Sequence, residues 1–298
     1  MPIIFETLKT EARIFHELNN NPHWWKQFKE DSSLYIEVRK DNQVNVYFEG
    51  GSIARIHYCS KHKKLQVFTH HKYLGLPVPS KCSSYIECSD FIDSCLDDVL
   101  ARIKTHYSQK NSANGVAPKE KWSEKYIQGT LIVQSRQFHL DSEFAYNDSE
   151  ISNRIDLVRC SDGMVTFVEL KRMGDNRMLH ETDATPEVVY QMNRYKQFIE
   201  KYSSQLLEYY QKLYDIKKSL ELPVPESRPV CINPIPELLI FDCWEKNTKG
   251  RDEHRRRLCE ILFKENVKFS IKSDFYHCVQ GFCTPCGDLL HLLTFLFV

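Results

Sequence analysis

The sequence predicts an α/β fold in the second half of the chain, within an α+β organisation overall. We expect a mixed sheet flanked by helices, preceded by a smaller N-terminal domain with an antiparallel sheet. Two observations predict this arrangement. The first half carries short strand-like segments separated by turn residues, whereas the second half follows the order helix, three strands, helix, strand.

The first half of the chain has the composition of an antiparallel meander. Its short segments are rich in β-branched and aromatic residues, and turn residues such as Asp41, Asn42 and Gly50 separate them. The strands expected from this pattern cover residues 34–39, 44–48, 53–58 and 65–69.

A helix and a linker are expected to close the N-terminal domain. Apolar residues recur every three or four positions over residues 90–106, and Ser89 is placed to cap this helix. The polar stretch 108–118 that follows contains an Asn-Gly pair and predicts a linker. We therefore expect one domain over residues 1–110 and a second over residues 118–298.

The second half alternates between helical and strand-like segments. Turn residues at 161–163 predict that two of the strands form a hairpin, and Pro186 is expected at the first position of a long helix. The expected elements are a helix near 119–130, strands over 131–146, 154–159 and 164–171, a helix from Pro186 past residue 206, a buried strand over 238–242, a helix over 251–263 and a strand over 267–271.

Composition and the terminal segments argue against a pure nucleic-acid coat protein, a secreted protein and a membrane-spanning protein. Lys and Arg together number 40, as do Asp and Glu, so a nucleic-acid site must come from local arrangement and not from overall charge. We expect no signal peptide and no membrane span, because the N-terminus has no basic region and the apolar run 289–298 is too short. The 11 cysteines are then expected as reduced thiols in a cytoplasmic protein.

Three charged residues of the predicted hairpin form a candidate metal site. Glu169 and Lys171 share one face of their strand, and the turn can bring Asp156 beside Glu169. Two adjacent carboxylates repel unless a cation joins them, and Mg²⁺, for which Mn²⁺ can substitute, suits such ligands. We expect Asp156 and Glu169 to hold the metal and Lys171 to orient a water molecule or help to deprotonate it.

Asp156, twelve further residues and then Glu169-x-Lys171 on apolar strands resemble the PD-(D/E)XK nuclease superfamily. Gln191 and Tyr195 are similar to the Gln-x-x-x-Tyr helix motif of its RecB-like branch, and lie on one helix face. The resemblance covers roughly residues 118–245. It implies a restriction-endonuclease-like core, and it implies that Gln191 and Tyr195 hold DNA or order the site.

The resemblance also implies an acidic residue on the helix before the first core strand. Two departures accompany it: Ile155 stands where the superfamily's name-giving proline would be, and a long gap containing residues 174–176 separates Lys171 from Gln191. That gap fits a flap that contacts substrate, or an insertion. The candidate acids are Glu124, the best match, then Glu120, with Glu143 and Glu150 as alternatives.

Other signals are weaker. Cys278, Cys283 and Cys286 can form a zinc site, but core thiols are the favoured interpretation because a second Cys-x-x-Cys pair is absent. The basic cluster within residues 246–257 can follow phosphates or be a solvated helix face. The Trp24–Trp25 and Tyr209–Tyr210 pairs are more typical of a core than of base stacking.

The resemblance implies a Mg²⁺-dependent nuclease that hydrolyses phosphodiester bonds, of DNA in preference to RNA, in restriction, repair or defence. One alternative is a catalytically inactive module that keeps the fold and binds nucleic acid or protein. Another is an interaction protein in which the N-terminal domain is the functional part. In the nuclease interpretation, the N-terminal domain is expected to recruit substrate or a partner protein, or to form a homodimer.

Overall fold

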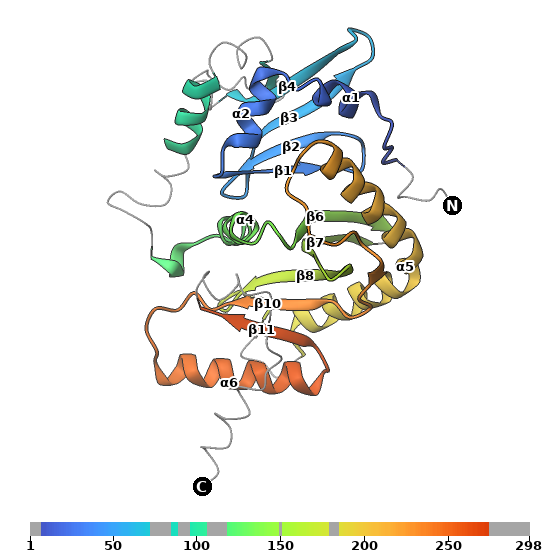
Figure 1. The fold of residues 1–298 in the computed structure, drawn as a ribbon. Coiled ribbons are helices and arrows are strands. Elements are labelled where there is room, and N and C mark those ends of the chain that lie inside the picture. Colours follow the sequence, from blue (N-terminus) through green and yellow to red (C-terminus); the bar gives the residue numbers. More distant parts are fainter. Residues whose placement is uncertain are drawn as a thin grey trace. The chain divides into compact units, whose positions relative to one another are not determined.

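The structure is a computed structural model that describes residues 7–71, 85–88, 96–105, 118–148, 151–178 and 185–273 (Figure 1). The chain divides into two compact units. Unit 1 comprises Met1–Ala117, Lys125–Gln137 and Glu208–Val224, and unit 2 comprises Pro118–Glu124, Phe138–Leu207 and Pro225–Val298. The N-terminal domain expected from the sequence lies within unit 1, which also takes in two segments from the second half of the chain.

Unit 1 contains the antiparallel meander that the sequence predicted. Each strand pairs with the next in the order β1-β2-β3-β4-β5, and a bulge interrupts the register between Val46 and Tyr47. The strands are β1 (Leu34–Val38), β2 (Val44–Phe48), β3 (Gly51–Cys59), β4 (Lys64–His70) and β5 (Tyr85–Glu87).

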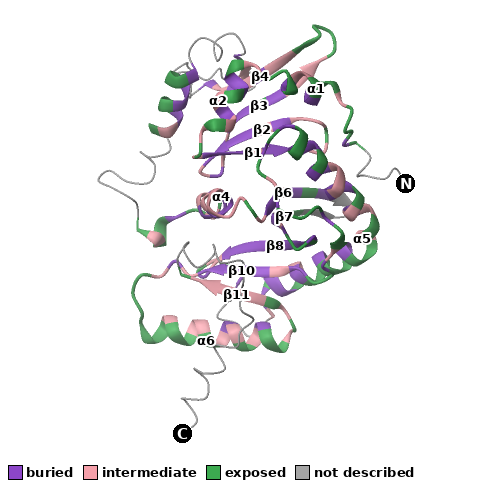
Figure 2. Ribbon diagram, viewed as in Figure 1, coloured by how far each residue is buried: buried purple, intermediate pink, exposed green. Residues whose placement is uncertain are grey.

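Two short helices cover this sheet. Helices α1 (Arg13–Asn19) and α2 (His23–Glu30) lie against β3 and β1 respectively. Trp24 and Trp25 are both buried, which confirms that this pair belongs to the core. Figure 2 shows the buried residues of these helices and strands in purple.

Helix α4 (Glu124–Gln134) corrects one prediction, that of a strand beginning at residue 131. The N–H of Ser135 donates to the carbonyl of Leu131 at 2.9 Å, so the helical pattern persists to this point. Leu131 and Ile132 are buried on the helix. A short apolar run satisfies core packing as a helix or as a strand, and composition alone does not separate the two.

A close approach of two glycines fixes the part of α4 that lies in unit 1. Gly50, in the β2–β3 turn, has φ +77°, which favours glycine. A Cβ atom on Gly129 of α4 would lie 2.3 Å from the Gly50 nitrogen, and one on Gly50 would lie 1.9 Å from the Lys125 carbonyl oxygen. Only glycine allows the helix and the turn to meet at this distance.

Unit 2 contains a mixed sheet with the strand order β11-β10-β8-β7-β6, and β9 pairs with the start of β8. Strands β6, β7 and β8 are antiparallel, whereas β8, β10 and β11 are parallel. The strands are β6 (His139–Asp148), β7 (Ile151–Ser161), β8 (Met164–Arg172), β9 (Cys231–Ile232), β10 (Glu237–Phe241) and β11 (Lys268–Lys272).

Helices complete the α/β arrangement. The expected order of helix, three strands, helix and strand is present as α4, β6–β8, α5 and β10. Helix α6 (Lys249–Lys264) packs on β11, and the first part of α5 (Glu187–Ser219) packs on β6 through Phe198, whose ring centre lies 4.4 Å from that of Tyr146 (Figure 1). The strands at the centre of the sheet are buried.

The start of α5 differs from the prediction. The carbonyl of Pro186 accepts the N–H of Val189 at 3.0 Å, so the proline precedes the first helical residue, Glu187. A kink with φ −115° lies at Tyr202, and Tyr209 and Tyr210 are buried beyond it, as expected of core residues.

Some predictions fall on other parts of the chain. A helix is present over residues 96–105, inside the expected 90–106, but its predicted cap at Ser89 lies outside the described residues. The same holds for Glu150, for Cys278, Cys283 and Cys286, and for the apolar run 289–298. Where the structure is described, we find no helix with both the length and the apolar character needed to cross a membrane.

A buried ion pair joins β1 to the last part of α5 within unit 1. The ammonium of Lys217 lies 3.0 Å from a carboxylate oxygen of Glu37, and the two side chains are 2% and 0% exposed. Burial of both charges is costly, so each requires the other.

We predict that Glu37→Gln lowers the free energy of unfolding by about 3–5 kcal/mol, because it leaves the Lys217 ammonium buried without its carboxylate. Chemical denaturation followed by circular dichroism measures this loss. The control is Glu208→Gln, which breaks the exposed Lys212–Glu208 pair and should cost about 0–1 kcal/mol. Equal losses in the two variants would contradict the prediction.

Candidate active site

The candidate site begins where the β7–β8 hairpin stops pairing. The ladder runs from Ser161↔Met164 to Leu157↔Val168, and the same register places Asp156 opposite Glu169. At this point the Asp156 carboxylate accepts the backbone N–H of Leu170 at 2.9 Å. The Asp156 side chain thus takes the place of a backbone carbonyl as the acceptor for Leu170. The carboxylates of Asp156 and Glu169 lie on the same side of the hairpin.

Glu169 and Lys171 lie on the central strand β8, where they are 2% and 1% exposed. The Lys171 ammonium donates to a carboxylate oxygen of Glu169 and to the Leu170 carbonyl, the latter at 3.1 Å. Strand β10 continues the sheet beside them, with Leu238 opposite Glu169. Lys171 is therefore the immediate counter-ion of Glu169.

Electrostatics make the carboxylate pair, Asp156 and Glu169, unfavourable as two anions. Burial, and then the negative charge of Glu169, raise the pKa of Asp156 to about 7. Burial also raises the pKa of Glu169, although the neighbouring Lys171 opposes this. A positive charge placed between the two carboxylates would offset both effects.

Gln191 and Tyr195 connect helix α5 to both strands of the hairpin. The Gln191 amide donates to a carboxylate oxygen of Glu169 and to the Tyr195 hydroxyl, each at 2.7 Å. The Tyr195 hydroxyl in turn donates to the carbonyl of Arg154 at 2.7 Å, two residues before Asp156. One chain of hydrogen bonds thus runs from Glu169 through the helix to the strand of Asp156.

The structure separates the candidate acidic residues. Glu124, the first residue of α4, is half-buried, and burial raises the pKa of its carboxyl while the charges of Lys171 and Arg177 lower it. Glu120 instead pairs with Arg251 at 2.9 Å. Glu143 forms an ion pair with an arginine, and its charge contributes to the raised pKa of Asp156.

Arg177, which belongs to the segment after β8, was not among the site residues predicted from the sequence. Its guanidinium pairs with Asp175 at 2.7 Å and reaches Glu124 at 3.4 Å. The hydrogen bonds to Asp175, and then the charges of Asp175, Glu124 and Glu169, raise the pKa of Arg177. The Asp-x-Arg spacing in the long gap was the available signal, but loops commonly carry such pairs.

The carboxylate pair fits a hard divalent cation such as Mg²⁺. Among the described residues, Oε2 of Glu169 is buried without a hydrogen-bond partner, so one carboxylate oxygen is left for a further ligand. No group of three or more His, Cys, Asp or Glu side chains in that part of the chain is arranged to hold a metal. Mg²⁺ accepts one or two carboxylates and completes its shell with water, whereas structural zinc needs four protein ligands.

Three arginines of the basic cluster, Arg251, Arg255 and Arg256, are engaged by contacts within the protein. Arg251 and Arg255 lie over the ring of Trp244, at 5.3 and 5.1 Å from its centre. Arg255 also pairs with Asp242 at 2.7 Å, and Arg256 pairs with two glutamates of its own helix. These contacts favour a structural role for the cluster.

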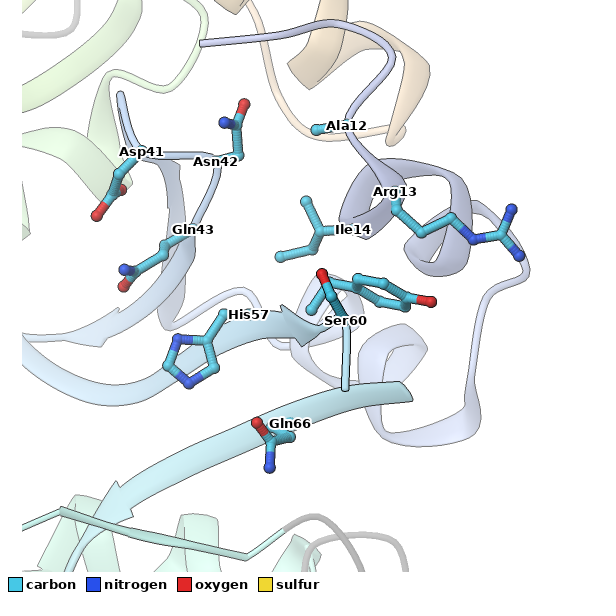
Figure 3. A pocket seen from close by; sticks show the side chains of 10 residues that line it. Ala12, Arg13, Ile14, Asp41, Asn42, Gln43, His57, Ser60 and Gln66 are labelled. Carbon is cyan, nitrogen blue, oxygen red and sulfur yellow. The ribbon is translucent and has the colours of Figure 1, made fainter. Parts of the chain in front are cut away.

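Unit 1 has a pocket of about 500 Å³ between α1, the β1–β2 turn and strands β3 and β4 (Figure 3). Several polar groups of its lining are already engaged. The Asn42 side chain bonds the backbone of Thr7 and Lys9, and Gln66 donates to Glu87 at 2.7 Å. The pocket therefore offers no group of convergent side chains comparable to that of unit 2.

We predict that Asp156→Asn stabilises the protein at pH 8 in the presence of EDTA. The pKa of Asp156 is raised to about 7 in the folded state, so stability falls as pH rises from the unfolded-state pKa through that value. Asparagine removes the charge and keeps an acceptor for Leu170, and Tm should rise by about 2–8 °C.

Differential scanning fluorimetry measures this effect. The increase in Tm of Asp156→Asn over the wild type should be smaller at pH 5, where Asp156 in the wild type is protonated. Mg²⁺ should raise the Tm of the wild type but not that of the variant. A variant that is less stable than the wild type at pH 8 would count against a repelling carboxylate pair.

Comparison with protein-family models, with curated proteins and with solved structures gives no match for this chain. The residues of unit 2 and their geometry are therefore the basis on which a function can be inferred.

Proposed function

We propose that this protein is a metal-dependent nuclease that hydrolyses phosphodiester bonds, with DNA favoured over RNA. The observation that carries the proposal is the meeting of Asp156, Glu169 and Lys171 on adjacent buried strands. Burying the Glu169 carboxylate and the Lys171 ammonium beside a second, half-buried carboxylate is expensive for a fold that gains only packing from them. Perturbed ionisable groups concentrated in this way are typical of functional sites.

Each residue then has a distinct task. Asp156 and Glu169 hold the metal, which when bound lowers the pKa of an attacking water and offsets charge on the phosphate. Lys171 donates a hydrogen bond to that water or to a phosphate oxygen. Water adds to phosphorus and releases one proton as the bond to the sugar oxygen breaks, and the leaving oxygen takes up a proton, so that the products are a phosphomonoester and a hydroxyl end. Glu124, the first residue of α4, is the additional acidic residue of the site.

Gln191 and Tyr195 act as positioning residues in this proposal. Gln191 fixes the orientation of the Glu169 carboxylate, and Tyr195 joins Gln191 to the backbone of β7. Catalytic groups must be held closely to be effective, and hydrogen bonds from a rigid helix provide that support.

The alternative of an inactive module differs in one measurable property. A site that has lost its chemistry has no need to keep metal affinity, whereas the proposed site binds Mg²⁺ or Mn²⁺ through Asp156. Calorimetric titration of either ion into the wild type and Asp156→Asn separates the two possibilities. Metal binding that is equal in both proteins would exclude the carboxylate pair as its ligands.

We predict that the purified protein cleaves nucleic acid in the presence of Mg²⁺ or Mn²⁺. Asp156→Asn, Glu169→Gln and Lys171→Met should each reduce the rate by at least about 100-fold, because each removes a metal ligand or a proton-handling group. Supercoiled, linear and single-stranded DNA and single-stranded RNA, incubated with each protein and resolved on gels, provide the measurement.

The control for this experiment is Glu253→Gln, which alters an exposed carboxylate on α6. It should cut at the rate of the wild type. If all variants and the wild type cut equally, a contaminating nuclease is responsible and the assignment is wrong.

We predict that Tyr195→Phe lowers the cleavage rate by about 10-fold and leaves metal binding within a factor of two, because its hydroxyl orients Glu169 and Gln191 and is not itself a metal ligand. Phenylalanine keeps the packing of a side chain that is 1% exposed. The matched control is Tyr190→Phe, which removes a hydroxyl from an exposed tyrosine of the same helix. Similar rates for the two variants would remove the positioning role from Tyr195.

A further inference from the structure

Arg177 is held in one orientation by Asp175. The Asp175 carboxylate accepts Nε of Arg177 at 2.8 Å and Nη2 at 2.7 Å, which is a two-point grip on the guanidinium. The same carboxylate accepts the backbone N–H of Arg177 at 2.9 Å. Such a fork fixes both the position and the plane of the guanidinium.

The segment that carries Arg177 is anchored to the core of unit 2. Met173 and Met178, on either side, are fully buried. The Met173 N–H donates to the Phe241 carbonyl at 2.9 Å, and the Arg177 carbonyl accepts the N–H of Val188 in the first turn of α5 at 3.1 Å. Arg177 is therefore presented by a braced turn between β8 and α5.

Part of the guanidinium remains available. The Arg177 side chain is 38% exposed, and its Nη1 group makes no hydrogen bond to any residue in the described part of the chain. The charge of Glu169 acts on Arg177, and the charges of Lys171 and Arg177 both act on Glu124. Arg177 thus lies at the edge of the candidate site, 3.4 Å from Glu124, and its Nη1 donors have no partner among the described residues.

We propose that Arg177 is a substrate-binding residue that holds a phosphate of the nucleic-acid strand beside Glu169 and Lys171. This inference rests on the proposed nuclease function and adds a residue that the sequence motifs do not contain. A guanidinium is planar, always charged and suited to phosphate oxygens, and fixing it in advance by Asp175 reduces the entropy lost on binding.

A purely structural salt bridge explains less of this geometry. A second cation beside Glu169 weakens the attraction of the carboxylates for a metal ion, and Asp175 alone would fix the turn through its bond to the backbone N–H. The Arg177 guanidinium therefore opposes metal binding, and this unfavourable effect is offset when the guanidinium binds a phosphate. Arg177 should consequently affect metal and nucleic acid in opposite directions.

The test measures both affinities on the full chain with Arg177→Gln. Binding of fluorescent single- and double-stranded DNA in Ca²⁺ buffer is followed by anisotropy over a range of salt concentrations, and Ca²⁺ binding without DNA is followed by calorimetry. We expect DNA affinity to fall about 3–20-fold and the salt slope to decrease by about one. Ca²⁺ affinity should increase about 2–5-fold, because a nearby positive charge is lost.

Two further variants control the experiment. Arg256→Gln alters an arginine of α6 that is similarly exposed and also pairs with two carboxylates, and it should change neither affinity. Arg177→Lys keeps the charge and loses the fork, so Ca²⁺ binding should stay at the wild-type value while DNA binding is intermediate.

Two results would overturn the inference. One is an Arg177→Gln protein with the DNA affinity and salt slope of the wild type, and the other is a variant that loses DNA and Ca²⁺ binding together, as a structural role requires. These results are distinct from failure of the proposed function. If the wild type cuts DNA and Arg177→Gln binds DNA normally, only the inference about Arg177 is wrong. If the wild type binds DNA through Arg177 but cuts none, only the proposed nuclease activity is wrong.

Discussion

Two carboxylates, the half-buried Asp156 and the buried Glu169, lie beside each other where strands β7 and β8 stop pairing, and their mutual repulsion is the constraint on which the organisation of the candidate site depends. A fold selected for stability alone would place apolar side chains at the centre of its sheet. Here two hydrogen bonds reduce the electrostatic cost without removing it. The backbone N–H of Leu170 donates to Asp156, and the ammonium of Lys171 donates to Glu169.

The contacts of helix α5 follow from that constraint. Gln191 satisfies one oxygen of Glu169, and Tyr195 carries the same chain of hydrogen bonds back to β7. The helix therefore does more than cover the apolar face of the sheet, because its hydrogen bonds connect the two strands that bear the carboxylates. The segment before α5 contributes Arg177, fixed by Asp175. Three successive parts of the chain, β8, this turn and α5, thus converge on one point.

Much of this arrangement could be predicted from periodicity and turn residues. The meander of unit 1, the β7–β8 hairpin and the facing of Asp156, Glu169 and Lys171 follow from alternation along strands, which is a local property. The extent of α4 could not be predicted, because the apolar run from Leu131 suits a helix or a strand equally well. Arg177 escaped prediction for a related reason, since its position depends on a turn whose geometry Asp175 imposes. The assignment of segments 125–137 and 208–224 to unit 1 depends on tertiary contacts that no local pattern encodes.

Lys171 links the stability of the site to its proposed chemistry. Its ammonium lies against the Glu169 carboxylate, so the carboxylate that a divalent cation would need as a ligand is already partly neutralised by Lys171. One oxygen of Glu169 has no hydrogen-bond partner among the described residues, and Asp156 has a pKa of about 7. Near neutral pH the chain therefore holds a carboxylate pair that one internal ammonium only partly compensates. A site in this condition gains more from a small cation than a fully paired one does, because the remaining repulsion is relieved when the cation binds. The incomplete compensation is thus a property that a metal-binding site requires and that a purely structural ion pair lacks.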